Sequence, residues 1–222
     1  MLALFNRLWS EVDSSWIDTE TTGIRIGFDK AVSVAAVRFE NQKPVAKFSS
    51  FVNPGMPIPP ESTAIHGITD DQVKGAPTIE QVFKNPKMIE VLEGAQPGAF
   101  NGPFDRNFVP PFMDPWDWPW FDALSFVRKF DRYVKGKGRH KLTEVCKRQS
   151  IVLENAHTAE ADSEAAGLLF YKLGAKVFPG VGDKNFPKGY TLGQALGWQR
   201  RIEAVEWLRF NQWLANQPPK EK

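Results

Sequence analysis

Three strand-like runs lie near the start of this chain, and they constrain the fold more than any other feature. Residues 15–18 form a short apolar run that leads into polar residues and a glycine, which is typical of a buried strand reaching a sheet edge. Residues 31–39 are β-branched and partly alternating, and residues 45–52 form another strand-like run. The turn-forming residues 41–44 between them predict an antiparallel hairpin. A weaker strand pattern at residues 96–100 precedes the helical segments. Strands first and alternating elements later favour an α/β fold.

The rest of the chain reads mainly as helices. A short helix is expected over residues 104–109, because the prolines at positions 110 and 111 must end it. Longer helical segments are expected at residues 124–133, 142–149, 159–173 and 191–216. The composition shifts to Gly, Pro and Lys over residues 178–188, which is typical of a linker. We therefore expect a main domain over residues 1–177, followed by a linker and C-terminal helical extension over residues 178–222.

Composition limits the class of protein. The 222 residues are 42% hydrophobic, enough for a substantial core, and the net charge of +2 does not by itself require a nucleic-acid partner. The single cysteine, Cys146, cannot form an internal disulfide, which fits a reducing, cytoplasmic setting. Arg7 and Glu11 interrupt the N-terminal apolar stretch and argue against a signal peptide, and no run approaches the ~18 apolar residues of a membrane span. We therefore expect a soluble, cytoplasmic protein.

Two carboxylates follow the first apolar run. Asp18 and Glu20 are separated by one residue, so in an extended strand both side chains project from the same face. Two anions held together repel each other, and a hard divalent cation such as Mg²⁺ or Mn²⁺ would relieve that repulsion. The plainer interpretation is an exposed acidic pair, because this spacing is common. The apolar strand before the pair and the Thr-Thr-Gly after it favour a metal site.

Two later segments can bring further polar groups to the same strand ends. Asp105 follows a predicted strand and a Gly-Pro turn, where α/β sheets place their ligands, although it could simply complement a helix dipole. His157 and Asp162 can face one site if His157 lies in a loop that Thr158 ends by capping the next helix. Alone, His157 would be interpreted as a surface histidine before an acidic helix start.

In order and spacing, these residues resemble the DEDDh exonuclease family. This DnaQ-like group contains the epsilon proofreading subunit of bacterial DNA polymerase III. Its three motifs are matched by Asp18-x-Glu20 with Thr-Thr-Gly, by the segment from Asn101 to Asp105, and by His157 with Asp162. The resemblance runs from about residue 15 to about residue 174. It implies a ribonuclease H-like fold, in which helices flank a mixed five-stranded sheet whose hairpin strand is antiparallel to the others.

The resemblance also implies a reaction. Relatives hydrolyse terminal phosphodiester bonds from the 3′ end with two divalent cations, Mg²⁺ or Mn²⁺, and release nucleoside 5′-monophosphates. By analogy, Asp18 would bridge both cations, and Asp105 would support one of them. Glu20 and Asp162 would hold the cation that carries the attacking water. His157 would be the general base, because histidine takes up protons near neutral pH.

Further positions correspond to residues with which relatives hold the 3′-terminal nucleotide. They are Thr21, Gly23, Ile24, His66, Ile68 and Asn101. The first three would line the terminal sugar and base, the next two would pack nearby, and the last would position the strand. His66 could instead be a loop histidine bonded to the backbone.

The expected partner is nucleic acid, and several alternatives remain open at this stage. Single-stranded DNA or frayed 3′ ends are the first expectation, with proofreading as one role, and RNA is the leading alternative substrate. A polymerase-associated module with mainly a binding role is a third possibility. The helix expected over residues 191–216 could dock a polymerase, although no docking motif is legible in it.

Two other features have both a functional and a plain interpretation. The basic loop over residues 135–141 could contact the phosphate backbone, or could simply be solvated. Trp116, Trp118 and Trp120 could stack on bases, but clustered tryptophans more often cover the edge of a core, which we favour.

Overall fold

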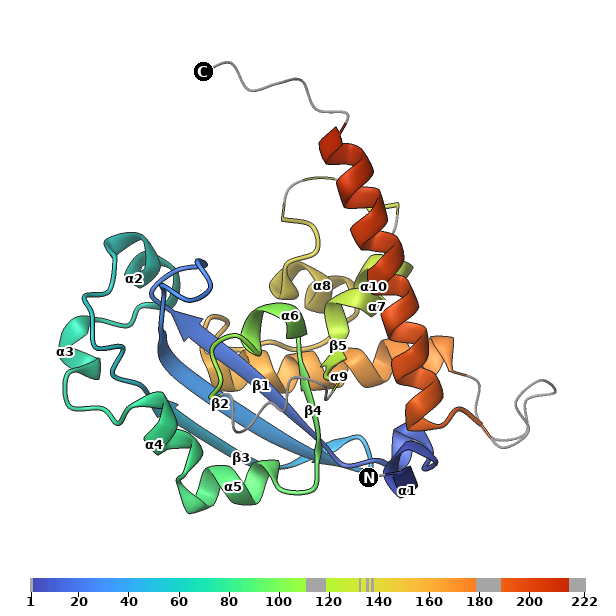
Figure 1. The fold of residues 1–222 in the computed structure, drawn as a ribbon, viewed down its shortest axis with the longest axis horizontal. Helices are drawn as coiled ribbons and strands as arrows, with labels where there is room; N and C mark the ends of the chain where they lie inside the picture. Colours follow the sequence, from blue (N-terminus) through green and yellow to red (C-terminus); the bar gives the residue numbers. More distant parts are fainter. Residues whose placement is uncertain are drawn as a thin grey trace.

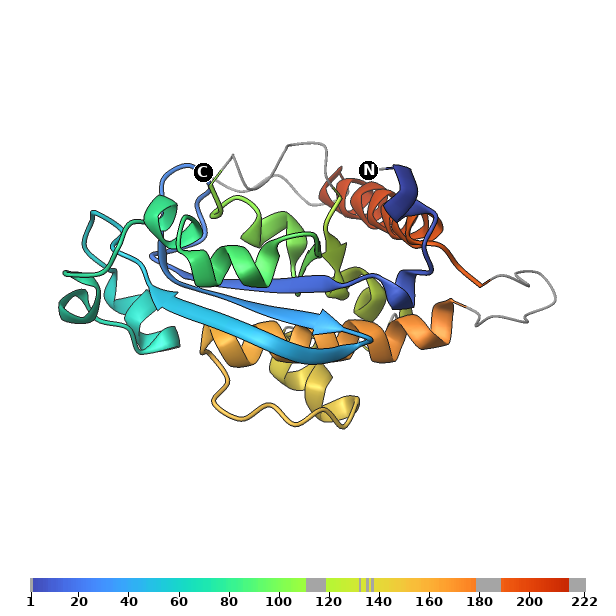
Figure 2. The ribbon, with the colours of Figure 1, turned by 90° about the horizontal axis from the view of Figure 1, so that it is seen from below.

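The protein is built around one mixed five-stranded sheet with helices on both faces (Figures 1 and 2). The computed structural model describes residues 2–110, 119–131, 133–134, 136, 138–178 and 189–215. The strand order is β3-β2-β1-β4-β5. The strands are β1 Ser14–Thr21, β2 Ala31–Glu40, β3 Lys43–Phe51, β4 Gln96–Ala99 and β5 Phe121–Asp122.

Strand directions confirm the expected mixed sheet. β2 is antiparallel to both β1 and β3, whereas β4 is parallel to β1 and β5 is parallel to β4. The β2–β3 hairpin turns at Asn41 and Gln42, whose φ angles of 50° and 65° are both left-handed. Two left-handed residues match the turn that suits the twist of a tight hairpin.

The helices have the following bounds. They are α1 Leu2–Phe5, η1 Trp9–Glu11, α2 Pro60–His66, α3 Asp70–Val73, α4 Ile79–Phe83, α5 Pro86–Leu92, α6 Gly102–Asp105, α7 Ala123–Phe130, α8 Leu142–Arg148, α9 Ala159–Val177 and α10 Leu192–Ala215. The helix expected over residues 104–109 is wrong in extent. A single turn, α6, begins directly after β4 at Gly102 with Pro103 in its first turn, and ordinary turns replace helix after Asp105.

The two faces of the sheet carry separate apolar clusters. Trp16 and Phe39 pack with α9 on one face, where Phe170 lies 4.9 Å from Trp16 between ring centroids. Ile17 and its neighbours on β2 pack with Phe83 and Met88 of α4 and α5 on the other face. Because side chains alternate along β1, Asp18 and Glu20 lie on the same face as Trp16, towards α9.

The first half of α10 packs into the α9-side core. Leu192, Ala195 and Leu196 are buried there, and Phe178 at the end of α9 belongs to the same cluster. An isolated bridge between Leu8 and Thr191 ties the start of α10 to the N-terminal segment (Figure 1). The predicted linker lies outside the described residues except for Phe178, so the domain boundary at residue 178 stays a prediction.

The described residues also bear on the predictions for the tryptophan cluster, the basic loop and a membrane span. Trp120 is buried in the second cluster, as expected of a tryptophan at a core edge, while Trp116 and Trp118 lie outside the described residues. The basic loop is described only in part, and in it His140 lies 3.4 Å from the carbonyl of Asp131. No helix in the described part of the chain combines the length and the apolar character needed to cross a membrane.

Candidate active site

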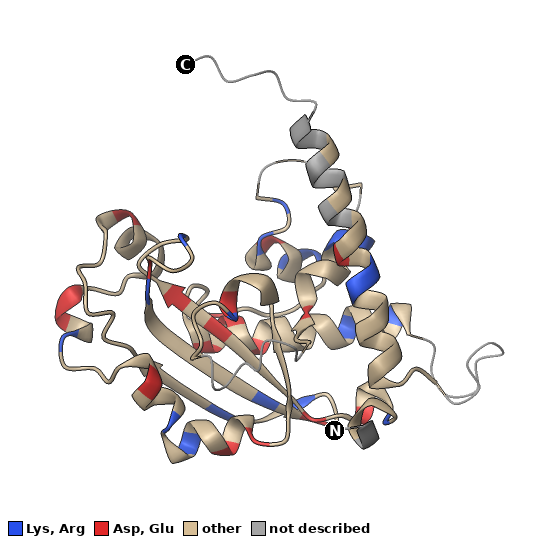
Figure 3. Cartoon of the chain, in the orientation of Figure 1, with Lys and Arg blue, Asp and Glu red and all other residues tan. Residues whose placement is uncertain are grey.

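Three carboxylates meet where β1 ends against the start of α9. Asp18 and Glu20 come from the strand, and Asp162 comes from the first turn of the helix. Each offers a ligand oxygen, and these three oxygens lie within 4.8 Å of one another. Figure 3 shows the resulting acidic colouring towards the tip of β1. Among the described residues, this is the group of acidic side chains with the geometry of a metal site.

The residues fit a hard cation in their chemistry as well as their spacing. Carboxylate oxygens are the ligands preferred by Mg²⁺ and Mn²⁺. One oxygen of Asp162, Oδ1, is buried without a hydrogen-bond partner in the described part of the protein. A buried acceptor without a partner carries a desolvation cost, which a cation bound between Asp162 and its neighbours would offset.

Asp105 approaches the same strand by a different route. β4 pairs with β1 only as far as Trp16, so it leaves the next part of this edge of β1 without a strand neighbour. Oδ1 of Asp105 accepts hydrogen bonds from the Thr19 backbone N–H at 3.1 Å and from Thr19 Oγ1 at 2.9 Å. The Asp105 carboxylate thus accepts the hydrogen bond that a neighbouring strand would otherwise accept from β1. It is buried beside Asp18 but outside the three-oxygen group.

Crowding and burial raise the pKa of each of these acids. Burial, and then the charges of Asp105, Asp162 and Glu20, raise the pKa of Asp18 well above its usual value. Burial and the charge of Asp162 raise the pKa of Glu20 to about 7. Burial raises the pKa of Asp105 to about 7 against the opposing bonds from Thr19, and burial also raises the pKa of Asp162. Groups of acids that raise one another's pKa are typical of cation sites and catalytic centres.

His157 is held at the entrance of this group by its backbone. Its φ of 69° is left-handed, which is uncommon for a residue other than glycine. Its N–H donates to Oδ2 of Asp162 at 3.3 Å, and Thr158 caps α9 by accepting from the Ala161 N–H at 3.4 Å. The His157 side chain is exposed. A strained backbone tied to a carboxylate of the group is typical of functional sites.

A pocket of about 370 Å³ opens beside Glu20. It is lined by His157 and by two of the expected nucleotide-binding residues, His66 and Ile68, together with the end of β3 at Ser49, Ser50 and Phe51. Nδ1 of His66 accepts the N–H of Ile68 at 3.0 Å, so this ring has a structural bond as well as a position in the pocket. Burial lowers the pKa of His66, which favours the neutral ring.

The other expected binding residues do not line this pocket. Oγ1 of Thr21 bonds to the carbonyl of Gly23 at 2.6 Å, and Ile24 is 81% exposed on the loop that follows. A side chain at Gly23 would meet the Asp29 carboxylate, because an added Cβ would lie 2.6 Å from its Oδ2. Asn101 caps α6 through its carbonyl, which accepts from the Asp105 N–H at 3.3 Å.

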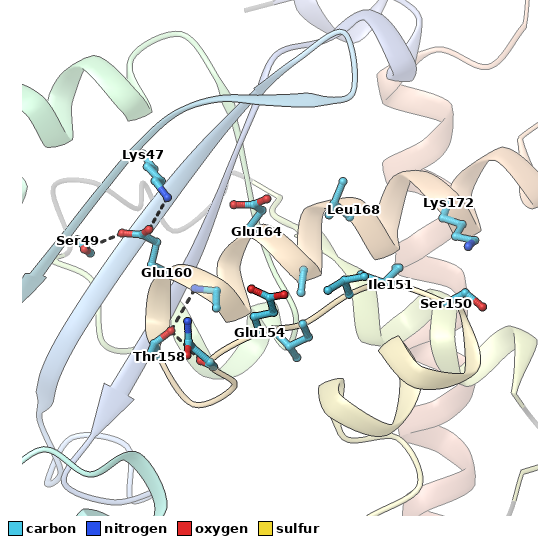
Figure 4. Close-up of a pocket in the computed structure, with 15 residues that line it drawn as sticks. Lys47, Ser49, Ser150, Ile151, Glu154, Thr158, Glu160, Glu164, Leu168 and Lys172 are labelled. Carbon is cyan, nitrogen blue, oxygen red and sulfur yellow. Dashed lines mark hydrogen bonds and ion pairs between the residues drawn. The ribbon is translucent and has the colours of Figure 1, made fainter.

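A larger hollow of about 1030 Å³ lies between β3, α9 and the loop over residues 150–155 (Figure 4). Glu160 stands between the two hollows and lines both. It bonds to Lys47 of β3 at 2.6 Å and to Ser49 at 3.0 Å, which ties the start of α9 to the sheet. Because none of the three clustered acids lines this hollow, we place the candidate active site at the smaller pocket.

Sequence reasoning missed Thr19 and Asp122. Thr19 holds Asp105, and Asp122 accepts the N–H of Gly102 at 3.2 Å at the start of α6. The sequence does place Thr19 between two acids on a strand. Its side chain must therefore point to the face of the sheet opposite to theirs. Asp122 had only the ordinary signal of an acid preceding a helix.

The sequence matches the RNase T family model, described as an exonuclease, over residues 15–170. The DNA polymerase III PolC-type of Streptococcus pneumoniae is 34% identical over 169 residues, which are 73% of this chain and 11% of that polymerase. The PolC-type polymerase of Bacillus cereus is 31% identical over 197 residues, which are 86% of this chain and 13% of that polymerase. The chain therefore spans only a small part of the length of these relatives.

Solved structures show the same fold. Exonuclease X in complex with 5′ overhanging duplex DNA has a TM-score of 0.57 and 24% identity, over 73% of this chain and 92% of that one. An E. coli ExoI–ssDNA complex has a TM-score of 0.61 and 20% identity, over 75% of this chain and 41% of that one. The nuclease domain of 3′hExo bound to rAMP, described as a DEDDh family member, has a TM-score of 0.57 and 17% identity, over 72% and 90%.

These likenesses confirm the ribonuclease H-like fold expected from the motifs. The matched family model covers more than half of the 222 residues and includes the whole carboxylate group. The chain belongs to the RNase T exonuclease family, and its expected kinship with the DEDDh exonucleases is confirmed.

Proposed function

We propose that this chain is a metal-dependent 3′→5′ exonuclease that removes nucleoside 5′-monophosphates from single-stranded or frayed DNA ends. The observation that carries the proposal is the meeting of Asp18, Glu20 and Asp162, with ligand oxygens within 4.8 Å, beside a pocket that also contains His157. A metal group and a candidate base at one pocket are the parts that phosphodiester hydrolysis needs.

Asp18, Glu20 and Asp162 would hold two divalent cations, Mg²⁺ or Mn²⁺, with Asp105 as a supporting acid. Bound cations of this kind stabilise charge on the phosphoryl group and on both the attacking and departing oxygens. The protein's own contribution is to fix the acids. Thr19 orients Asp105, and the His157 backbone N–H orients Asp162.

His157 would take the proton from the attacking water. Its side chain is exposed at the pocket that contains Glu20, and its backbone is fixed through Asp162, so the ring can reach the pocket without a change in the helix. His66 and Ile68 line the same pocket, which supports a role in holding the terminal nucleotide. Thr21, Gly23, Ile24 and Asn101 are proposed to extend that surface along the strand.

DNA is the favoured substrate because the relatives of Streptococcus pneumoniae and Bacillus cereus are DNA polymerases. RNA is the second candidate, since one structural neighbour is bound to a ribonucleotide. Proofreading alongside a polymerase, with α10 as the docking element, is consistent with the PolC-type relatives and needs a separate binding test.

Digestion of 5′-labelled oligonucleotides tests this function. With Mg²⁺ or Mn²⁺, single-stranded DNA and a mismatched 3′ end should shorten stepwise from the 3′ side, and chelator should stop the reaction until cation is restored. A matched RNA of the same sequence provides the comparison. Faster digestion of RNA would favour the second candidate, whereas internal cuts, or no shortening of either strand, would contradict the proposal.

A further inference from the structure

A side chain of the C-terminal helix completes the edge of the sheet. Gln199 of α10 is only 4% exposed. Its Oε1 accepts the Asp122 backbone N–H at 2.9 Å, and its Nε2 donates to the Trp120 carbonyl at 2.8 Å. Trp120 and Asp122 are alternate residues, so these two backbone groups point to the same side of β5, away from β4.

β5 is the last strand of the sheet in the described part of the chain, and Gln199 pairs with backbone groups on its outer side. Unpaired buried backbone groups are costly, and proteins cover such edges. The amide of Gln199 offers one acceptor and one donor at the spacing of a neighbouring strand's peptide. It therefore acts as a substitute for a sixth strand.

A second residue of α10 extends this contact into a partly buried polar network. Glu203 lies one turn after Gln199, accepts a hydrogen bond from its Nε2 at 2.8 Å, and lies 3.5 Å from Ser125 Oγ. Ser125 also donates to the carboxylate of Asp122 through both its N–H and its hydroxyl. Connected hydrogen bonds of this kind restrict their members to one arrangement.

The network ends at the turn that supplies Asp105. Oδ1 of Asp122 accepts the N–H of Gly102, the first residue of α6, at 3.2 Å. Asp105 is the last residue of the same single turn and bonds to Thr19 between the two acids of β1. Hydrogen bonds, together with the single backbone turn of α6, thus join α10 to the carboxylate group.

We propose that Gln199 and Glu203 are positioning residues of the active site. They fix the end of β5 and, through Asp122, the orientation of α6 and its Asp105. This inference rests on the proposed function, because the position of Asp105 affects catalysis only if cations bind beside it. Under this proposal, the first half of α10 helps to position the catalytic acids in addition to any role in binding a partner.

A purely structural role for α10 predicts a different result, and a neighbouring residue supplies the comparison. Trp198 packs against Phe126 and Phe178, with ring centroids 5.0 and 5.5 Å apart, and so contributes apolar packing beside the network. Trp198→Leu should weaken the packing of α10 without removing the bonds of Gln199. Gln199→Met keeps the length and approximate volume of the side chain but removes its three hydrogen bonds.

The test uses the full chain and two readouts. Amide hydrogen exchange, followed by NMR without cation, should become faster in Gln199→Met at Asp122, at Gly102 and as far as Thr19. The Mn²⁺ concentration that gives the half-maximal rise in melting temperature, and that supports half-maximal digestion, should increase about tenfold, the usual scale for residues that orient metal ligands. Arg200→Gln changes an exposed residue of the same helix outside the proposed network and should remain close to the original protein.

The outcomes separate the two proposals. Equal Mn²⁺ dependence in Gln199→Met and Trp198→Leu, with faster exchange confined to β5, would overturn the positioning role. If Gln199→Met does not fold, Ser125→Ala carries the same test, because it removes the hydroxyl between Glu203 and Asp122. Absence of 3′ digestion by the original chain would count against the proposed function instead, since exchange at Thr19 reports on the network without substrate.

Discussion

Asp18→Asn is expected to abolish digestion of 3′ ends, with a loss of at least about 10³-fold in turnover at saturating Mg²⁺. Asp18 shares a group of close oxygens with Glu20 and Asp162, and the charges of these two acids and of Asp105 all raise its pKa. Removal of this anion should abolish cation binding, and with it several kcal/mol of stabilisation of the reacting phosphoryl group. Each ~1.4 kcal/mol of lost stabilisation lowers the reaction rate roughly tenfold. Turnover of a labelled oligonucleotide provides the measurement.

The same substitution should stabilise the metal-free protein, and the effect should depend on pH. Glu20 and Asp105 each have a folded-state pKa of about 7, above their usual values of 4.5 and 3.8, so the folded protein binds more protons than the unfolded chain between these limits. Stability of the metal-free protein therefore falls as pH rises from about 4 through about 7. Asp18→Asn relieves this repulsion, so its melting temperature should exceed that of the original chain at pH 8 and differ little at pH 4.

A surface acid provides the control for this prediction. Asp71 is exposed on α3, and Asp71→Asn removes the same charge away from the carboxylate group. It should leave both turnover and the pH dependence of the melting temperature close to those of the original chain. A melting temperature of Asp18→Asn that does not exceed the original value at pH 8 would contradict the electrostatic account of the site.

His157→Asn should reduce turnover by about 10²–10⁴-fold, the usual contribution of a general base. Asparagine suits the test because it tolerates the left-handed backbone at φ 69°, while its amide cannot take up a proton near neutral pH. The side chain is exposed, and the bond to Asp162 comes from the backbone, so the fold and Mn²⁺ binding should be retained. Single-turnover rates with pre-bound oligonucleotide measure the chemical step.

His140→Asn is the matched control, because His140 is also a loop histidine but contacts the Asp131 carbonyl outside the pocket. Its turnover should remain within a few fold of the original. Undiminished single-turnover rates in His157→Asn would remove His157 from the role of base, and would leave the carboxylate group to be judged separately.

Much of this architecture could be predicted from local patterns. The β2–β3 hairpin follows from two strand-like runs joined by turn residues, and the meeting of Asp18 with Glu20 follows from strand periodicity alone. Their convergence with Asp162 is a long-range contact, and only the order of the motifs indicated it. His66 satisfies both interpretations given to it, since it bonds to the backbone of Ile68 and lines the pocket.

Other features could not be predicted because they depend on where distant elements stop. Asp105 bonds to Thr19 because β4 leaves β1 after Trp16, and no local pattern gives the length of that pairing. Gln199 is polar and lies on a helix, so its burial at 4% exposure reflects an open strand edge that the sequence does not display. The roles of α10 in docking and of residue 178 as a boundary stay predictions.

Mn²⁺ bound to crystals of the full chain, located by anomalous scattering, tests the central claim most directly. Our account predicts two peaks, both in contact with Asp18, with Glu20 and Asp162 at one of them and Asp105 on the side of the other. Both peaks should disappear in Asp18→Asn. Mn²⁺ peaks that lie away from these side chains would contradict this account. So would a carboxylate group without any peak at cation concentrations that support digestion.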